Sequence, residues 1–265
     1  MKKTAFIGCG NMGSAIVRAV CRSTDPETIY VSNRSAEKAR RLAEDCGCIC
    51  CGSNLEAVRG ADCIILGVKP WQIGDVLLQI RPLLLGHELI VSMAAGVSGS
   101  AIREKLPGGN PIVRILPNTP CAIGKGLMLI APCGEVDEAL LGDLEQLLSP
   151  CGLVFRTDED HAEAGMTVGG CTPAFTYMFI EALADGGVKA GLKRSDALRW
   201  AAQAVAGAAE MVLQSGVHPG ALKDAVCSPG GATIEGVATL ERGAFRSSVM
   251  DAVYNAAEKS AKPGG

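Results

Sequence analysis

The sequence predicts an α/β domain with a doubly wound sheet, followed by an all-helical domain. Short β-branched runs alternate with amphipathic stretches up to about residue 156, which is the rhythm of βαβ units. After residues 158–160, an Asp-Glu-Asp run, the strand pattern stops and alanine-rich segments with helical spacing follow. At about 150 residues per domain, the chain has room for two domains. We therefore expect domains at residues 1–158 and 159–265.

The strands and helices of the first half follow one another closely. The predicted strands cover residues 4–8, 29–32, 63–68, 88–92, 111–116, 127–131 and 153–156, and the predicted helices cover residues 14–22, 36–46, 71–80 and 136–148. Every connection is short, as in a compact α/β domain. We expect a sheet of about eight strands.

The second half carries helical spacing in five segments, at residues 162–189, 195–214, 219–227, 231–242 and 244–259. Small residues between Ala201 and Ala209 allow helices to approach closely. A helical domain this poor in aromatic residues gains a larger core by pairing with another copy, so we expect a homodimer or a higher oligomer of dimers. We expect the tail, residues 262–265, to be frayed.

Composition excludes several classes of function. The chain has 25 Lys and Arg residues against 28 Asp and Glu and only 4% aromatic residues, which argues against nucleic-acid binding. It has no 18-residue apolar span, so we expect no membrane partner. The 12 cysteines are too sparse for a disulfide scaffold and predict reduced thiols in the cytoplasm. The cluster Cys46, Cys48, Cys50 and Cys51 has no second cysteine pair or nearby histidine, so we expect no metal.

A glycine-rich motif follows the first predicted strand and opens the first predicted helix. It has the form G-x-G-x-x-G and consists of Gly8, Cys9, Gly10, Asn11, Met12 and Gly13. Its glycines allow a tight turn and a close approach of the backbone to a pyrophosphate, and the helix N-terminus supplies N–H groups for the anion. We expect these six residues to bind a dinucleotide.

The end of the second predicted strand suggests which dinucleotide binds. An Asp or Glu there would bind the ribose 2′-hydroxyl of NAD, but this chain has Ser32, Asn33 and Arg34. A guanidinium without a competing carboxylate favours a 2′-phosphate, so we predict NADPH, with NADH as a possible second cofactor. The alternative is that Arg34 is simply a solvated residue at a helix start.

Two further strand ends supply candidate cofactor contacts. The buried strand at residues 63–68 ends in Val68, Lys69 and Pro70, and the next one leads into Met93, Ala94 and Ala95. The carboxyl ends of parallel strands share one edge, where such sheets bind ligands. We expect all six residues to line the cofactor cleft.

The helical half contains one informative turn, residues 226–237, which ends one helix and begins the next. Ser228, Pro229, Gly230, Gly231, Ala232 and Thr233 present several N–H groups and two hydroxyls, which suits a small carboxylate. The alternative is a capping turn that only joins two helices.

Six blocks in the same order give the chain a resemblance to the pyrroline-5-carboxylate reductase family along nearly its whole length. They are the motif at residues 8–13, Val68-Lys69-Pro70, Ala94-Ala95-Gly96, residues 114–120, residues 182–188 and residues 228–233. The resemblance implies a Rossmann domain, an interleaved helical dimer, and hydride transfer from NAD(P)H to the C=N carbon of L-1-pyrroline-5-carboxylate, giving L-proline in the last step of proline biosynthesis.

The same resemblance assigns roles to residues. Ser228, Gly230, Gly231, Ala232 and Thr233 would hold the substrate, with Thr233 near the ring nitrogen, and Asn54 would contact the adenosine part of the cofactor. A cyclic iminium is already electrophilic, so hydride positioning suffices and Thr233 is our catalytic candidate. The chain departs from the family at residues 169–175, where Gly-Gly-Cys-Thr-Pro-Ala-Phe replaces Ser-Gly-Ser-Gly-Pro-Ala-Tyr.

Three alternatives stay open at this point. A β-hydroxyacid dehydrogenase shares the layout and would use a helical lysine, for which Lys189 is the candidate, although Lys193 stands where an asparagine is expected. A relative could reduce another cyclic imine, since residues 169–175 are unusual. A regulator could keep the fold without catalysis, since fold alone does not fix function.

Overall fold

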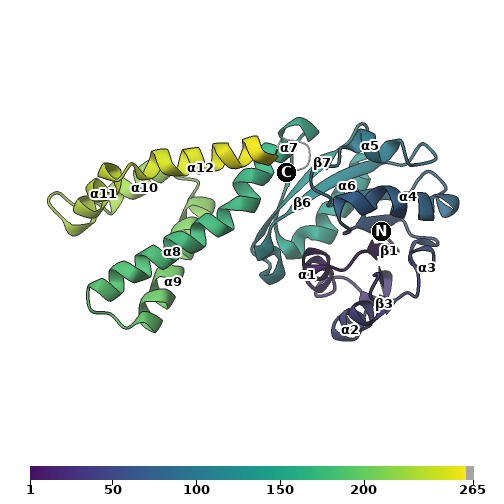
Figure 1. Ribbon diagram of the computed structural model, residues 1–265, viewed down its shortest axis with the longest axis horizontal. Helices are drawn as coiled ribbons and strands as arrows, with labels where there is room; N and C mark the ends of the chain where they lie inside the picture. Colours follow the sequence, from purple (N-terminus) through teal and green to yellow (C-terminus); the bar gives the residue numbers. More distant parts are fainter. Residues whose placement is uncertain (261–265) are drawn as a thin grey trace. The chain divides into compact units, whose positions relative to one another are not determined.

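The computed structural model describes residues 1–260, and the chain divides into two compact units (Figure 1). The N-terminal unit comprises Met1–Gly170 together with the end of α12 (Phe245–Ser260) from Ala257 on, and the helical unit comprises Cys171–Ala256. The tail at residues 262–265, for which we predicted fraying, lies outside the described residues.

One eight-stranded sheet organises the N-terminal unit, in the order β3-β2-β1-β4-β5-β6-β7-β8. The strands are β1 (Thr4–Ile7), β2 (Ile29–Ser32), β3 (Ile49–Cys50), β4 (Cys63–Leu66), β5 (Leu89–Ser92), β6 (Ile112–Pro117), β7 (Gly126–Pro132) and β8 (Gly152–Arg156). All neighbours pair in parallel except β6 and β7, which are antiparallel. The first six strands follow the order of doubly wound dinucleotide-binding sheets, which confirms the predicted fold class.

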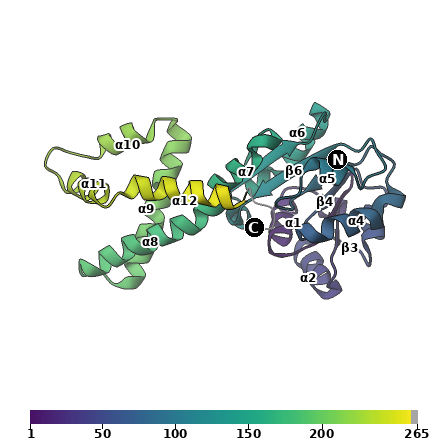
Figure 2. The ribbon, with the colours of Figure 1, turned by 45° about the horizontal axis from the view of Figure 1, so that its top comes forward.

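Helices cover both faces of this sheet (Figures 1 and 2). One face packs against α1 (Asn11–Val20), α2 (Ala36–Cys46) and α6 (Glu138–Leu148), and the other packs against α3 (Asn54–Val58), α4 (Ile73–Ile80) and α5 (Gly99–Arg103). Neighbouring strand residues such as Ile64 and Ile65 point to opposite faces and are both fully buried. A parallel strand buried on both faces needs a continuous apolar run, which is why these strands do not alternate with polar residues.

Short side chains set where the helices begin. Asp137 accepts hydrogen bonds from the N–H groups of Ala139 and Leu140 at the start of α6, and Asp158 caps α7 (Glu159–Met166) by accepting from His161. The N-terminal unit also contains five 3₁₀ segments, namely η1 (Pro26–Thr28), η2 (Pro70–Gln72), η3 (Arg81–Leu83), η4 (Thr119–Ile123) and η5 (Ser149–Cys151). Proline stands at the start of each, where its missing N–H costs nothing.

The helix predicted across residues 162–189 is wrong in its middle. The structure has α7, then a π-helical turn at Thr167–Cys171, then α8 (Thr172–Lys189). The side-chain amide of Asn118 donates to the carbonyl of Gly169 over 2.9 Å, which gives this carbonyl a partner outside the helix. Gly169 and Gly170 also have low helix propensity, so a regular α-helix is weakest at this point.

The helical unit contains α8, α9 (Arg194–Ser215), α10 (Pro219–Ala225), α11 (Ala232–Arg242) and most of α12. Its buried core consists of Ala184, Ala197 and Ala201, with Ile180 and Val188 packed against them. Large apolar side chains stay exposed, including Trp200 at 61% and Met178 at 70%. A unit with so small a core and so much exposed apolar surface is typical of an oligomer interface.

Among the residues described, no helix has both the length and the apolar composition needed to cross a membrane. All twelve cysteines lie within residues 1–260 and all are free thiols. No group of three or more His, Cys, Asp or Glu side chains in this part of the chain is arranged to hold a metal ion.

Candidate active site

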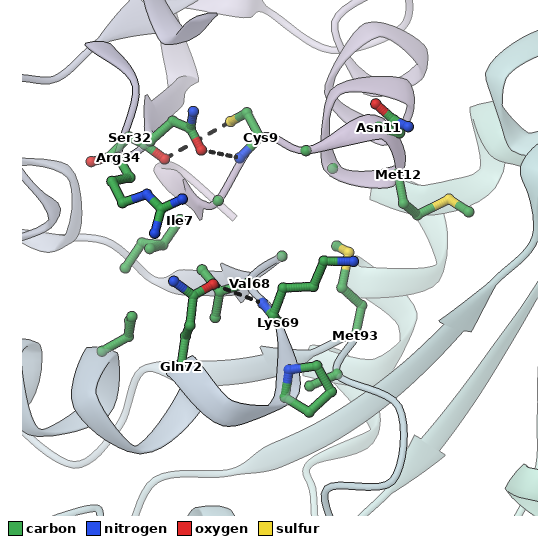
Figure 3. Close-up of a pocket in the computed structure, with 18 of the residues that line it drawn as sticks. Ile7, Cys9, Asn11, Met12, Ser32, Arg34, Val68, Lys69, Gln72 and Met93 are labelled. Atoms are coloured by element: carbon green, nitrogen blue, oxygen red, sulfur yellow. Dashed lines mark hydrogen bonds between the residues drawn. The ribbon is translucent and has the colours of Figure 1, made fainter. Parts of the chain in front are cut away.

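The glycine-rich loop between β1 and α1 forms the floor of a cavity in the N-terminal unit. Gly10 is the N-cap of α1 and has no side-chain cap, so the first N–H groups of the helix are available to an anion. The N–H of Gly8 donates to the carbonyl of Ser32 over 2.8 Å, and the N–H of Cys9 donates to the side-chain oxygen of Asn33 over 3.1 Å (Figure 3). These bonds tie the loop to the end of β2.

Two of the three motif glycines are required by their surroundings. Gly8 has φ +90°, and a Cβ there would lie 2.6 Å from a methyl group of Val68. A Cβ on Gly13 would lie 2.4 Å from the carbonyl oxygen of Gly8. A Cβ on Gly10 would meet nothing within 4 Å, so the packing of the chain does not require glycine at this position and leaves space there for a ligand.

The opposite rim of the loop is held by a chain of side-chain hydrogen bonds. The Ser32 hydroxyl donates to the side-chain oxygen of Asn54 over 2.8 Å, and the Asn54 amide donates to Gln79 over 2.8 Å. Asn54 therefore links the end of β2 to α4 and faces the cavity between them. Beside it, the backbone N–H of Lys69 donates to the Gln72 side chain over 3.3 Å (Figure 3).

Burial keeps the thiol in this loop neutral. Cys9 is buried, and its burial, reinforced by the neighbouring thiols of Cys48, Cys50 and Cys46, raises its pKa to about 12. Its sulfur lies 3.9 Å from the carbonyl oxygen of Ser32, and the S–H donates to this oxygen. Cys9 is therefore a packing residue of the loop, without thiolate chemistry at neutral pH.

All sixteen residues that we predicted to contact the cofactor line one cavity of about 1060 Å³. They are Gly8, Cys9, Gly10, Asn11, Met12, Gly13, Ser32, Asn33, Arg34, Asn54, Val68, Lys69, Pro70, Met93, Ala94 and Ala95. The cavity runs from the end of β2 past the β1–α1 loop to the end of β6. The structure thus brings these residues together, and their contacts with a cofactor stay a prediction.

Other residues that line the cavity were not predicted from the sequence. They are chiefly Lys38 on α2, Gln72, Gln79 on α4, Glu163 on α7 and Met166. Lys38 stands in the first turn of α2, four residues after Arg34, and this closeness in sequence could have revealed it. Glu163 lies far along the chain from the glycine-rich loop, and only the packing of α7 beside β7 brings it to the cavity.

The predicted substrate turn lies in the helical unit, between α10 and α11. The N–H of Gly231 donates to the carbonyl of Ser228 over 3.0 Å, which closes a turn with Pro229 and Gly230 at its centre. Gly230 has φ +65°, so this is a type II turn, in which proline and then glycine are the favoured pair. A Cβ on Gly231 would lie 2.4 Å from the Ser228 hydroxyl and 3.1 Å from the Ser228 carbonyl oxygen, so a larger residue there would displace the Ser228 side chain.

The turn leaves the start of α11 open to solvent. Gly231 is the N-cap of α11 without a side-chain cap, and both Ser228 and Thr233 are exposed. The first N–H groups of the helix and the two hydroxyls are therefore available to an anion, as expected for a carboxylate subsite.

The fold and the cavity define a Rossmann-type, dinucleotide-dependent oxidoreductase.

Two curated proteins named pyrroline-5-carboxylate reductase are each 40% identical to this chain. The protein of Pisum sativum matches over 96% of this chain and 93% of its own length, and that of Escherichia coli over 98% of both. The chain belongs to the pyrroline-5-carboxylate reductase family, which confirms the resemblance seen in the sequence.

Family profiles and solved structures agree with this assignment. Residues 159–263 match the profile described as pyrroline-5-carboxylate reductase dimerisation, and residues 3–96 match one described as NADP oxidoreductase, coenzyme F420-dependent. A pyrroline-5-carboxylate reductase from Coxiella burnetii superposes with a TM-score of 0.92 at 32% identity, covering 98% of this chain and 97% of its own. The Plasmodium falciparum enzyme, solved with NADP bound, gives 0.85 at 33% identity, covering 97% and 96%.

Proposed function

We infer that this chain reduces L-1-pyrroline-5-carboxylate to L-proline with NAD(P)H, the last step of proline biosynthesis. Full-length similarity to enzymes of this name carries the inference. The reaction adds a hydride to the C=N carbon of the ring whose nitrogen is already protonated, and the electron pair of the C=N π bond becomes the lone pair of the amine nitrogen. Family membership selects this activity over the β-hydroxyacid dehydrogenase and the non-catalytic regulator.

The described residues fit a nicotinamide dinucleotide. Gly10 leaves open space where its Cβ would be, and the uncapped N-terminus of α1 presents N–H groups to a pyrophosphate. Gly8, Gly10 and Gly13 would hold the pyrophosphate, and Asn54 would contact the adenosine. When bound, the reduced cofactor supplies the hydride. Val68, Lys69, Pro70, Met93, Ala94 and Ala95 would flank the remainder of the molecule.

The end of the cavity at β2 supports a preference for NADPH. Arg34 and Lys38 both line it, and Ser32 and Asn33 lie beside them. No carboxylate lines the cavity beside these two cations, and their two positive charges suit the two negative charges of a 2′-phosphate. NADH remains a second, weaker cofactor in this proposal.

Replacing Arg34 with glutamine is expected to raise the KM for NADPH by about 10- to 100-fold, the loss of a charge-assisted hydrogen bond. The KM for NADH should change less than twofold, because NADH has no 2′-phosphate. Steady-state kinetics with both cofactors measure this. Arg40, also an exposed cation and borne by α2 outside the cavity, supplies the control Arg40→Gln. A wild-type preference for NADH would contradict the assignment.

The turn before α11 would bind the substrate. Ser228, Gly230, Gly231 and Ala232 would hold the carboxylate through hydroxyl and N–H groups, and the Thr233 hydroxyl would orient the ring nitrogen. A cyclic iminium needs a positioned hydride more than a strong acid, so one orienting donor suffices. The absence of a strong acid agrees with the positions of the histidines, because His87, His161 and His218 are all exposed and none lines the cavity.

The chain forms a homo-oligomer through a dimerisation domain. We propose a homodimer, or an assembly of such dimers, built on the exposed apolar side chains of the helical unit. We keep the domain division at residues 1–158 and 159–265 and the cytoplasmic location as proposals, together with the absence of nucleic-acid, membrane and metal partners.

The activity itself is tested by the loss of NADPH absorbance on adding pyrroline-5-carboxylate. We expect oxidation of NADPH to match the formation of proline one to one. A panel of β-hydroxyacids with NADP⁺ in the reverse direction should give no reduction. No oxidation with pyrroline-5-carboxylate would overturn the proposed function, and oxidation only with another cyclic imine would reassign the substrate and implicate residues 169–175.

A further inference from the structure

The cavity has two chemically different ends. Arg34 lies at the end of β2, and Ile115, Leu116 and Pro117 lie at the end of β6. A dinucleotide with its adenosine at β2 and its pyrophosphate on the β1–α1 loop extends toward β4, β5 and β6. The end at β6 is therefore where the nicotinamide ring belongs, which rests on the proposed function.

Glu163 places a negative charge at this end. It lies on α7, lines the cavity together with Met166, and is the only carboxylate among the lining residues that the structure describes. The other charged lining residues are the cations Arg34, Lys38 and Lys69. The cavity is thus cationic at its β2 end and beside the end of β4, and anionic at the β6 end, where the ring belongs.

Arg114 on β6 fixes Glu163 in place without cancelling the charge. The Arg114 guanidinium is 6% exposed, forms an ion pair with Glu163, and lies 3.5 Å from an oxygen of Glu159. The Glu159 carboxylate also accepts a 2.6 Å hydrogen bond from the N–H of Gly99. Two carboxylates share one guanidinium, so this cluster keeps a net negative charge.

The Glu163 side chain keeps a route to a ligand. It is 34% exposed, whereas Arg114 behind it is almost completely buried. Arg114 pairs with one oxygen of the carboxylate, Oε1, and the partly exposed Glu163 is also among the residues that line the cavity. A carboxylate in a partly desolvated site acts on nearby charges more strongly than it would in water.

We propose that Glu163 is a specificity-determining residue that favours the oxidised cofactor, whose nicotinamide ring is cationic, over the reduced one, whose ring is neutral. The two forms are otherwise nearly identical, so a charge at the ring end discriminates between them. The same charge stabilises the ring as it becomes positive during hydride transfer. Glu163 neither donates nor accepts a proton in this scheme.

The test compares dissociation constants for NADP⁺ and NADPH by calorimetry, in wild type and in Glu163→Gln at constant ionic strength. Glutamine keeps an oxygen for Arg114 and removes the charge. We expect the ratio of the NADP⁺ constant to the NADPH constant to rise about 5- to 10-fold in the variant. Glu163→Asp, which keeps the charge, should stay within about twofold of wild type.

Lys38→Gln is the matched control, because it alters charge in the same cavity at the other end. It should weaken both forms equally and leave the ratio unchanged, since both carry the same phosphates. An unchanged ratio in Glu163→Gln, with both forms still bound, would overturn the inference. Failure of wild type to bind either form would instead refute the proposed function.

A second measurement does not depend on the variant folding. In wild type, raising the salt concentration from about 0.02 to 0.5 M should screen Glu163 in part and raise the same ratio by less than the Glu163→Gln change does, because screening of the common phosphates cancels. A ratio independent of salt would count against Glu163 as the discriminating charge.

Discussion

Replacing Gly13 with alanine should abolish measurable NADPH binding and lower the melting temperature of the protein. The new Cβ would lie 2.4 Å from the carbonyl oxygen of Gly8, a backbone atom that cannot swing aside as the end of a flexible side chain can. A Cβ on Gly67 would strike the same oxygen at 2.4 Å, so β1 and β4 leave the loop no room to retreat. The loop must therefore move as a whole, and the α1 N-terminus moves with it.

Isothermal titration with NADPH and thermal unfolding measure the two effects separately. We expect no detectable binding at millimolar cofactor and a loss of stability of about 1 to 3 kcal/mol, as for overpacking in a core. Gly142, in the middle of α6, has open space around its missing Cβ, so Gly142→Ala should leave NADPH binding near wild type and raise the stability by up to about 1 kcal/mol, because alanine is the better helix former.

Gly10→Ala separates the fold from the ligand within the same motif. Its Cβ would meet nothing within 4 Å, so the melting temperature should stay near wild type while NADPH binding weakens by about 10- to 100-fold. If Gly13→Ala folded and bound normally, the close packing of this loop would not be required for cofactor binding. If Gly10→Ala bound normally, the pyrophosphate would not pass over this glycine.

The sequence predicted the strands and helices best where they are long and patterned. It missed β3, because a strand of two exposed residues leaves no periodicity to detect. It also missed α3 and α5, each five residues long, although Ser53 and Ser98 cap them by accepting N–H bonds from Glu56 and Ala101. These serines are the feature that could have revealed both helices.

Tertiary contacts decided what the local sequence could not. The antiparallel placement of β7 beside β6 has no counterpart in the pattern of either strand, since β7 is apolar throughout and β6 is apolar except for Arg114. The π-helical turn depends on Asn118, about fifty residues before the carbonyl that it binds. In the same way, local sequence motifs predicted the sixteen cavity residues, whereas Glu163 reaches the cavity only through the packing of α7, which no local motif indicates.

Thr233→Ala should lower kcat/KM for pyrroline-5-carboxylate by about 100-fold, the usual effect of removing one oriented donor from a reacting centre. Among the described residues, the Thr233 hydroxyl has no hydrogen-bond partner, so the chain does not need it for its own structure. Because Thr233→Ala removes a methyl group and a hydroxyl at an exposed position in the first turn of α11, we expect no change in the melting temperature.

Thr239 on the same helix is the matched control for this prediction. Its hydroxyl donates to the carbonyl of Glu235 over 2.9 Å and accepts a hydrogen bond from Arg242, which are contacts within the helix itself. Thr239→Ala should therefore keep full activity, and Thr233→Ser, which restores the hydroxyl, should recover most of it. NADPH affinity should be the same in all three variants, because α11 is not part of the cavity that holds the dinucleotide in our proposal. If Thr233→Ala turned over at the wild-type rate, the Thr233 hydroxyl would not orient the ring nitrogen, because removing such a hydroxyl must lower kcat/KM. The ring would then be positioned by the cofactor and the carboxylate contacts alone.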